Sequence, residues 1–410
     1  MFTRSGPFGR LFWLTLAAVA LVPTTRSSAL HVHPQVSAIA AAEKLPPALL
    51  GRLEREGPLA KAWVFFKDKG LPTATARDAT LEQVAAGYNP RAVQRRLLRG
   101  DRVRAGGRLF DEHDLPVAPS YIEAVAGTGA RVHVASRWLN AVSVRATRVE
   151  FEQIARLPFV GRVQPVARAR ASRPVEMQAM GSGTPPTDRG VGTLDHGYST
   201  AQLNQINVID LHDAGYTGAG VAIGILDTGF RRTHAAFIYP GHPVNVLAEY
   251  DFVNNDGNTG IEPGDPSDQH EHGTLILGCI GAYLPGGIVG GAYDAAFILC
   301  KTEDISAEYP AEEDNYVAGL EFIEAHGGDV ATSSLGYIDW YTQDDLDGQT
   351  TVTTIAVNIA TANGLFCCNA AGNSGHDNNP NTSHLVAPGD AFQVITCGAA
   401  TVDGYIAHMR

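Results

Sequence analysis

The chain has 410 residues, of which 44% are hydrophobic and 18% charged. This balance excludes a disordered or low-complexity protein and leaves room for two or three domains. The formal net charge of −12 is unevenly distributed: residues 1–180 carry 26 basic and 14 acidic side chains, whereas residues 181–410 carry 5 and 29. The basic half has no nucleic-acid-binding motif, so we expect the two halves to pair with each other and expect no nucleic-acid partner.

Residues 1–29 have the pattern of a secretory signal peptide. Arg4 and Arg10 precede an apolar core, Leu11–Val22, and Ser27-Ser28-Ala29 fits a small-residue cleavage site. The apolar core is too short to span a membrane comfortably, and the sequence has no second stretch of sufficient length. We therefore expect an exported protein, extracellular or periplasmic, with no membrane contact after the signal is cleaved.

Residues 30–168 mix short helices and strands, which predicts a small α+β domain. The predicted strands are Ala62–Phe66, Val132–Ala135, Ala141–Val144 and Gly161–Val166, and the predicted helices are Pro90–Leu98, Tyr121–Val125 and Val149–Leu157. In Pro90–Leu98 the apolar residues Val93, Leu97 and Leu98 are interspersed with arginines, and we expect those arginines to face water. Residues 169–198 follow as a linker, because proline and glycine are concentrated between Ala169 and Gly192.

Residues 199–410 have the alternation of a parallel, doubly wound α/β domain. Val221–Leu226 (VAIGIL) and Ala295–Lys301 are short apolar runs typical of strands buried on both faces. Gln202–Ala214 predicts one amphipathic opening helix, and Val317–Ala325 predicts a helix closed by Gly327-Gly328.

Three side chains that could take part in catalysis lie beside apolar runs in this second half. Asp227 follows Val221–Leu226 directly, at the carboxyl end of a predicted strand, where catalytic groups collect in open α/β sheets. His272 lies in the first turn of the helix predicted within His270–Ala282, and Asn373 lies in a glycine-rich loop. A carboxylate can pair with one imidazole nitrogen and leave the other for a nucleophile, while an amide can donate to an oxyanion. Taken alone, Asp227 could instead be a turn aspartate that caps the next segment.

The ordered motifs strand-Asp-Thr-Gly, His-Gly-Thr and Ala-Ala-Gly-Asn-x-Gly resemble those of the subtilisin-like serine proteases, the subtilase family. A secreted bacterial branch of the family is similar in the segments Lys301–Asp304, Glu312–Asn315 and Ser333–Tyr337. The resemblance implies a three-layer parallel-sheet catalytic domain over residues 199–410. It implies that Asp227 is the triad aspartate, His272 the general base and Asn373 the oxyanion-hole donor. Substrate-binding residues implied for a polypeptide substrate are Ser334, Leu335, Gly336, Ala371 and Gly372.

The nucleophilic serine of this family follows the asparagine in a Gly-Thr-Ser context, and no Gly-Thr-Ser occurs after Asn373. Ser374 and Ser383 stand in polar loop sequence. We therefore expect a serine endopeptidase that lacks its C-terminal part and is inactive as this 410-residue chain. The alternative is a non-catalytic pseudoprotease that binds peptides.

Preceding such a domain, residues 30–168 resemble the family's propeptide, which helps folding and acts as an intramolecular inhibitor. The linker over residues 169–198 would then contain the maturation site. The alternative for residues 30–168 is an unrelated N-terminal binding module.

Acidic side chains cluster between Glu303 and Asp314, and Asp251–Asp256 (DFVNND) places oxygen ligands at short spacing. Either segment could bind Ca²⁺, and the first could bind a basic substrate residue. We expect solvated surface for Glu303–Asp314, assign no metal ligand, and expect no cofactor. The cysteines are Cys279, Cys300, Cys367, Cys368 and Cys397. Their apolar or small-residue contexts predict buried thiols and not a disulfide framework or a metal site.

Overall fold

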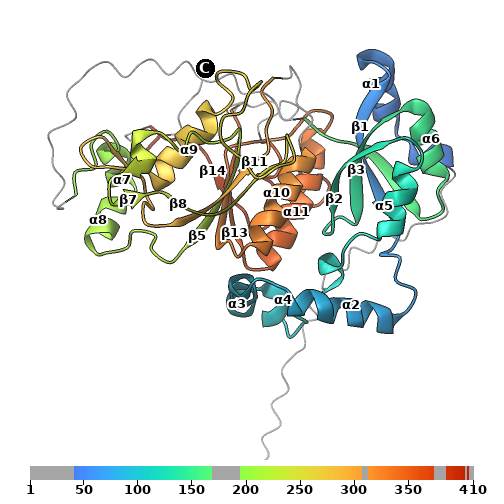
Figure 1. Ribbon diagram of the computed structural model, residues 1–410, viewed down its shortest axis with the longest axis horizontal. Helices are drawn as coiled ribbons and strands as arrows, with labels where there is room; N and C mark the ends of the chain where they lie inside the picture. Colours follow the sequence, from blue (N-terminus) through green and yellow to red (C-terminus); the bar gives the residue numbers. More distant parts are fainter. Residues whose placement is uncertain (1–40, 169–193, 307–312, 374–384, 402–403, 406–410) are drawn as a thin grey trace, which may run out of the picture. The chain divides into compact units, whose positions relative to one another are not determined.

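A computed structural model of the protein describes residues 41–168, 194–306, 313–373, 385–401 and 404–405. The segments expected to be the signal peptide and most of the linker lie outside these residues. Within the described ranges, no helix combines the length and apolarity needed to cross a membrane. Residues 41–168 and residues 194–405 are described in turn below (Figure 1).

The N-terminal part is built on a four-stranded antiparallel sheet with strand order β2-β3-β1-β4. Its elements are η1 (Ala41–Lys44), α1 (Pro47–Glu56), β1 (Leu59–Phe66), α2 (Ala74–Ala86), α3 (Pro90–Arg99), α4 (Asp101–Arg104), η2 (Glu112–Asp114), α5 (Pro119–Ala126), β2 (Arg131–Ser136), β3 (Ala141–Thr147), α6 (Arg148–Arg156) and β4 (Val160–Pro165). One face of the sheet packs against α1, α5 and α6 around Leu49, Val125 and Phe151. The predicted strands, and the helices α3, α5 and α6, are therefore present, with ends shifted by a few residues.

The start of α6 has a local cause. Thr147 and Glu150 form a capping box, in which each side chain accepts a hydrogen bond from the other residue's backbone N–H. This exchange satisfies two donors that a helix N-terminus otherwise leaves without partners. The capping box therefore stabilises the turn between β3 and α6 through contacts within residues 147–150.

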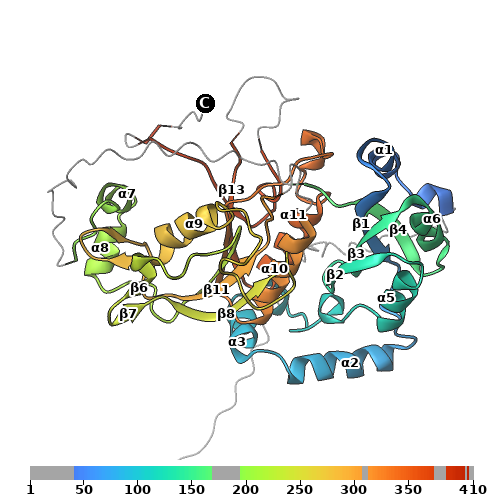
Figure 2. The ribbon, with the colours of Figure 1, turned by 45° about the horizontal axis from the view of Figure 1, so that its top comes forward.

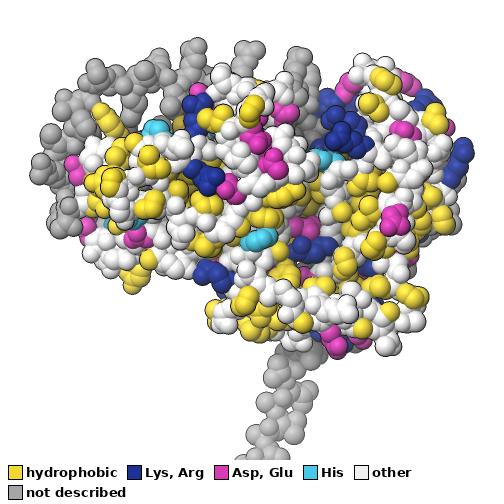
Figure 3. Space-filling view, viewed as in Figure 1, with side chains coloured by type: hydrophobic (Ala, Val, Ile, Leu, Met, Phe, Trp, Pro, Cys, Tyr) yellow, Lys and Arg dark blue, Asp and Glu magenta, His cyan; other side chains and the backbone are white. Residues whose placement is uncertain are grey.

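Helix α3 forms as predicted, but the prediction that its arginines face water is wrong for Arg95 and Arg96. Arg95 and Arg96 are only 2% and 1% exposed, whereas Leu97 and Leu98 are 51% and 64% exposed. Figure 3 shows hydrophobic side chains on the surface in the region of α3 and α4. The arginines turn inward because their partners include carboxylates and carbonyl groups of the C-terminal part, which local periodicity does not reveal.

The C-terminal part contains a six-stranded sheet in which every neighbouring pair is parallel, with order β14-β13-β12-β5-β11-β8. Its elements are α7 (Thr200–Gln205), α8 (Val208–Asp213), β5 (Ala222–Asp227), η3 (Ala235–Phe237), β6 (Ile238–Tyr239), β7 (His242–Pro243), β8 (Asn245–Asp251), α9 (Glu271–Gly281), β9 (Tyr283–Leu284), β10 (Ile288–Val289), β11 (Ala296–Lys301), α10 (Glu313–Ala325), β12 (Val330–Ser333), η4 (Gln343–Asp345), α11 (Val352–Ala362), β13 (Phe366–Ala370) and β14 (Ile395–Cys397).

Strand β5 is buried on both faces, as its composition predicts, and every residue of it is buried. Ile223 and Ile225 pack in a core with Leu277 of α9. Leu226 packs in a second core with Leu320 of α10 and with residues of α11. Figure 2 shows the sheet between α9 and the pair α10 and α11. The three-layer parallel α/β architecture is thus confirmed.

The predicted opening helix, Gln202–Ala214, is divided into α7 and α8. Asn207 separates them with a positive φ of 58°. A left-handed residue cannot continue an α-helix, and asparagine adopts that conformation more readily than most residues.

The prediction of solvated surface for Glu303–Asp314 is wrong for Glu303, Glu313 and Asp314, which are buried, whereas Ile305 and Ser306 are exposed. Glu313 and Asp314 begin α10 and are both 0% exposed. Trp63 donates to Glu313 at 3.1 Å, while Lys61 lies 2.8 Å from Asp314. The acidic residues are buried because the basic N-terminal part covers them, which agrees with the expected pairing of the two halves.

All five cysteines are free thiols in the structure. Cys300 and Cys367 are buried, but Cys279 and Cys397 are exposed. The expectation of burial for all five is therefore wrong: Cys397 lies on β14, the edge strand of the sheet, where all three residues are exposed.

Candidate active site

The carboxyl edge of the sheet brings Asp227 and His272 together. Asp227 is the last residue of β5 and is 0% exposed, and His272 is the second residue of α9. The loop after β5 holds the helix N-terminus, because Thr228 Oγ1 accepts a hydrogen bond from Gly273 N at 3.1 Å. A Cβ on Gly273 would lie 2.2 Å from Gly229 O, so only glycine permits this close approach.

The imidazole of His272 is oriented by the carboxylate. His272 Nδ1 lies 2.7 Å from Asp227 Oδ1, which also accepts from Thr228 N at 2.7 Å. Because a carboxylate only accepts hydrogen bonds, Nδ1 carries the proton and Nε2 offers its lone pair. The His272 side chain is 43% exposed while Asp227 is fully buried, so the pair is fixed at one end and open to solvent at the other.

The electrostatic surroundings raise the pKa of His272 above its usual value. The hydrogen bond to Asp227 is the largest cause; burial opposes it, and the negative charge of Glu303 adds to it. Glu303 follows β11, is 5% exposed and accepts a hydrogen bond from Tyr337 Oη at 2.7 Å. Sequence reasoning missed this residue because it treated the acidic segment as surface; its place two residues after a buried strand was the available signal.

The other predicted site residues lie after neighbouring strands of the same sheet. Ser334, Leu335 and Gly336 follow β12 and are half-buried. Their segment is supported by Asn369 of β13, whose side-chain amide donates to Leu335 O at 3.1 Å. Since β12 is parallel to β5, the segment leaves the sheet at the same edge as Asp227.

Ala371, Gly372 and Asn373 follow β13 in the same way. Ala371 N donates to Cys397 O at 2.9 Å, and Gly372 has a φ of 107°, which turns the chain out of the strand. The Asn373 side chain is exposed at the end of this described stretch. The topology therefore places Asn373 at the edge that carries Asp227, while the downstream residues 374–384, including Ser374 and Ser383, lie outside the described residues.

Acidic residues also meet beyond β8, where carboxylate oxygens of Asp251, Asp256 and Glu262 lie within 4.8 Å of one another. Sequence reasoning had noted the first two but not Glu262. Asp251 already accepts hydrogen bonds from two backbone amides and from Asn254, and Lys301 Nζ lies 2.9 Å from it. A Ca²⁺ ion would have to displace this ammonium group, so the arrangement does not fit a calcium site.

Comparison with known proteins agrees with this geometry. The family model described as the peptidase S8 propeptide domain of Bacteroidota matches residues 61–179, and that of the subtilase family matches residues 218–409. Minor extracellular protease Vpr of Bacillus subtilis is 32% identical over 198 residues, 47% of this chain and 22% of Vpr. Subtilisin Savinase of Lederbergia lenta is 29% identical over 177 residues, 42% of this chain and 55% of Savinase.

The crystal structure of fervidolysin from Fervidobacterium pennivorans is similar with a TM-score of 0.50 and 17% sequence identity, over 84% of this chain and 44% of fervidolysin. The similarity to fervidolysin supports the fold alone, and the chain spans less than two thirds of each of these relatives. The two family models, the parallel sheet and the Asp227–His272 pair lead to one conclusion: the chain belongs to the subtilase family and carries a subtilase propeptide domain ahead of its subtilisin-like domain.

Proposed function

We propose that the chain carries the acid–base part of a serine endopeptidase site. The observation that supports this proposal is the 2.7 Å hydrogen bond between the buried Asp227 and the half-exposed His272. In this arrangement His272 Nε2 would accept the proton of a serine nucleophile and later return it to the leaving amine. Asp227 would keep the required tautomer and stabilise the imidazolium.

Substrate contacts in this proposal come from the segments after β12 and β13. Ser334-Leu335-Gly336 would pair with an extended polypeptide through backbone hydrogen bonds, alongside Ala371 and Gly372. The Asn373 amide would donate to the oxyanion of the tetrahedral intermediate, an interaction that contributes about 10²–10³-fold to turnover in related enzymes. The propeptide would inhibit the site until the linker is cut, and the signal sequence would direct export.

The nucleophile requires its own experiment. No Gly-Thr-Ser follows Asn373 among the 410 residues, so the coding DNA after the codon for Arg410 is the place to search for this motif. The coding DNA should contain Gly-Thr-Ser within about 100 codons in one of the three frames. The corresponding longer product should hydrolyse peptides, and Asp227→Asn should reduce its kcat by about 10⁴-fold, the loss seen when a triad aspartate is changed.

The geometry itself is tested on the present chain. His272 should titrate above the usual histidine pKa, followed by NMR of the imidazole, and Asp227→Asn should remove that increase. An imidazole that titrates at the ordinary value in both proteins would contradict the proposed pair.

The absence of Gly-Thr-Ser within the sequence also keeps a second function open, a peptide-binding pseudoprotease. It predicts that no frame restores the motif and that the chain binds an extended peptide without cleaving it. Turnover by the longer product would exclude this alternative.

A further inference from the structure

Helix α3 contacts the C-terminal part in a way that its own sequence does not explain. Its leucines face solvent while Arg95 and Arg96 are almost completely buried. Burying a guanidinium group is costly unless its N–H groups and its charge are matched by acceptors. The partner surface must therefore be polar and negatively charged, and the contacts of Arg95 show how it is built.

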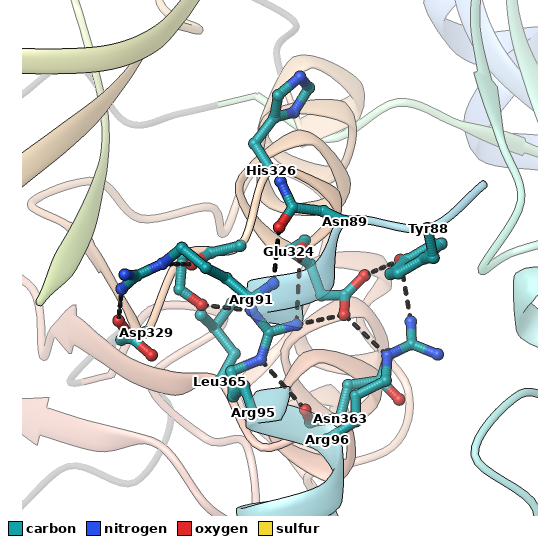
Figure 4. A network of polar contacts seen from close by, with 12 residues as sticks. Tyr88, Asn89, Arg91, Arg95, Arg96, Glu324, His326, Asp329, Asn363 and Leu365 are labelled. Atoms are coloured by element: carbon teal, nitrogen blue, oxygen red, sulfur yellow. Dashed lines mark hydrogen bonds and ion pairs between the residues drawn. The ribbon is translucent and has the colours of Figure 1, made fainter. Parts of the chain in front are cut away.

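Arg95 inserts between the carbonyl ends of two helices, α10 and α11 (Figure 4). Its Nε donates to Asn363 O at 3.2 Å, just after α11, and its Nη2 donates to Glu324 O at 3.3 Å in the last turn of α10. Its Nη1 donates to Gly328 O, beyond α10. The last carbonyl groups of a helix lack internal partners and carry the negative end of the helix dipole. A planar guanidinium with five N–H groups matches such a set of acceptors.

A buried carboxylate completes this pocket. Glu324 is 0% exposed and accepts hydrogen bonds from Arg95, Arg96 and Tyr88. Burial disfavours the charged form of Glu324, but Arg96 and Arg95 outweigh burial and lower its pKa. Arg96 is matched in turn by the buried Asp114 of the N-terminal part, at 2.8 Å. The contact is thus an ionic network with partners from both parts.

Asp329 forms the rim of this pocket and links α3 to the sheet. Asp329 lies 2.5 Å from Arg91 and 3.0 Å from Arg99, and it also accepts from Ala222 N at 3.1 Å. Ala222 begins β5, and Asp227 ends it. A strand of this length spans roughly 20 Å. Helix α3 therefore binds at the amino edge of the sheet, at the opposite end of β5 from His272.

We propose that the carbonyl ends of α10 and α11, together with Glu324 and Asp329, form an arginine-selective docking site for a helix, and that α3 of the N-terminal part is its occupant. This site holds the N-terminal part through the amino edge of the sheet, independently of the edge that carries Asp227 and His272. The inference concerns association between the two parts and does not depend on peptidase activity.

Hydrogen–deuterium exchange on the full chain tests this site. Arg95→Met and Arg95→Lys should each raise amide exchange in α3 and around Gly327-Gly328 and Asn363-Gly364 at least tenfold. Lysine should not rescue, because one ammonium group cannot reach acceptors on two helices. Exchange in β1 and α9, and the NMR titration of His272, should stay as in the wild type. Asp329→Asn, a change at the rim, should raise exchange in α3 by a smaller factor.

Arg108→Gln is the matched control. It removes one arginine from the same part, but the Arg108 side chain is 71% exposed and pairs with Asp78 of α2. It should leave exchange in α3 unchanged. If Arg95→Met leaves amide exchange in α3 unchanged, the proposal is overturned. A uniform loss of protection across the chain in Arg95→Met would also overturn it, because the contact of α3 would then not be independent of the rest of the fold. Full protection in Arg95→Lys would overturn the selectivity for arginine.

Discussion

Replacement of Gly273 by alanine tests how α9 presents His272. The added Cβ would lie 2.2 Å from Gly229 O and 3.2 Å from Asp227 Oδ1, and real Cβ contacts essentially never fall below 3.0 Å. The N-terminus of the helix must therefore withdraw by about 0.8 Å, the difference between 3.0 and 2.2 Å. The same movement lengthens the Asp227–His272 hydrogen bond from 2.7 Å to about 3.5 Å, beyond useful hydrogen-bonding distance.

This substitution has one stabilising and two destabilising effects on the free energy of unfolding. Alanine has the better helix propensity, a gain of about 1 kcal/mol. Overpacking at the loop costs about 1–3 kcal/mol, and loss of a hydrogen bond to a charged group costs about 1.5–3 kcal/mol. The two costs outweigh the gain, so Gly273→Ala should destabilise the protein by about 1.5–5 kcal/mol.

Gly278 in the same helix provides the control, because a Cβ there meets nothing within 4 Å. Gly278→Ala should stabilise the protein by about 0.5–1 kcal/mol. Urea denaturation followed by circular dichroism measures both changes, and NMR titration should place the pKa of His272 closer to its ordinary value in Gly273→Ala only. If the two variants shift the midpoint equally and His272 titrates as in the wild type, the close approach at Gly273 does not control the site.

Three further predictions concern buried and exposed groups. Burial raises the pKa of Glu313 from 4.5 to about 8, so the folded protein keeps a proton that the unfolded chain releases. The free energy of unfolding should therefore fall as the pH rises from about 4.5 to 8. Urea titrations at several pH values measure this slope, which Glu313→Gln should flatten. Burial and the neighbouring His212, 2.9 Å away, lower the pKa of His196. Stability of α7 and α8 should therefore decrease as the pH falls below about 6.5, seen as faster amide exchange, and His196→Gln should reduce this effect. Cys397 is exposed and should react with a maleimide in the native protein. Cys300 is buried, and burial raises its pKa, so it should react only after unfolding. Mass spectrometry measures the labelling, and equal labelling of the two cysteines in the native protein would contradict the burial pattern.

The sequence specified much of the sheet edge that carries Asp227 and His272. The apolar run before Asp227 required a strand buried on both faces, and β5 is such a strand. The glycines around His272 indicated a tightly packed helix, and α9 begins one residue before it. Because a side chain at the end of a parallel strand and one at the start of a packed helix meet at the same edge of the sheet, their proximity could be inferred from local patterns.

The tertiary structure alone decided which charged groups are buried. Local periodicity suggested that the arginines of α3 face water and that Glu313 and Asp314 are solvated. Both expectations fail because the partners are remote: Arg95 and its acceptor Gly328 are 233 positions apart. Whether a charge is buried depends on the acceptors that surround it after folding, and these belong to another part of the chain. The sequence by itself determined the strands, the helices and the chemical character of the candidate site, because these depend on neighbouring residues; the docking of the two parts depends on contacts between distant ones.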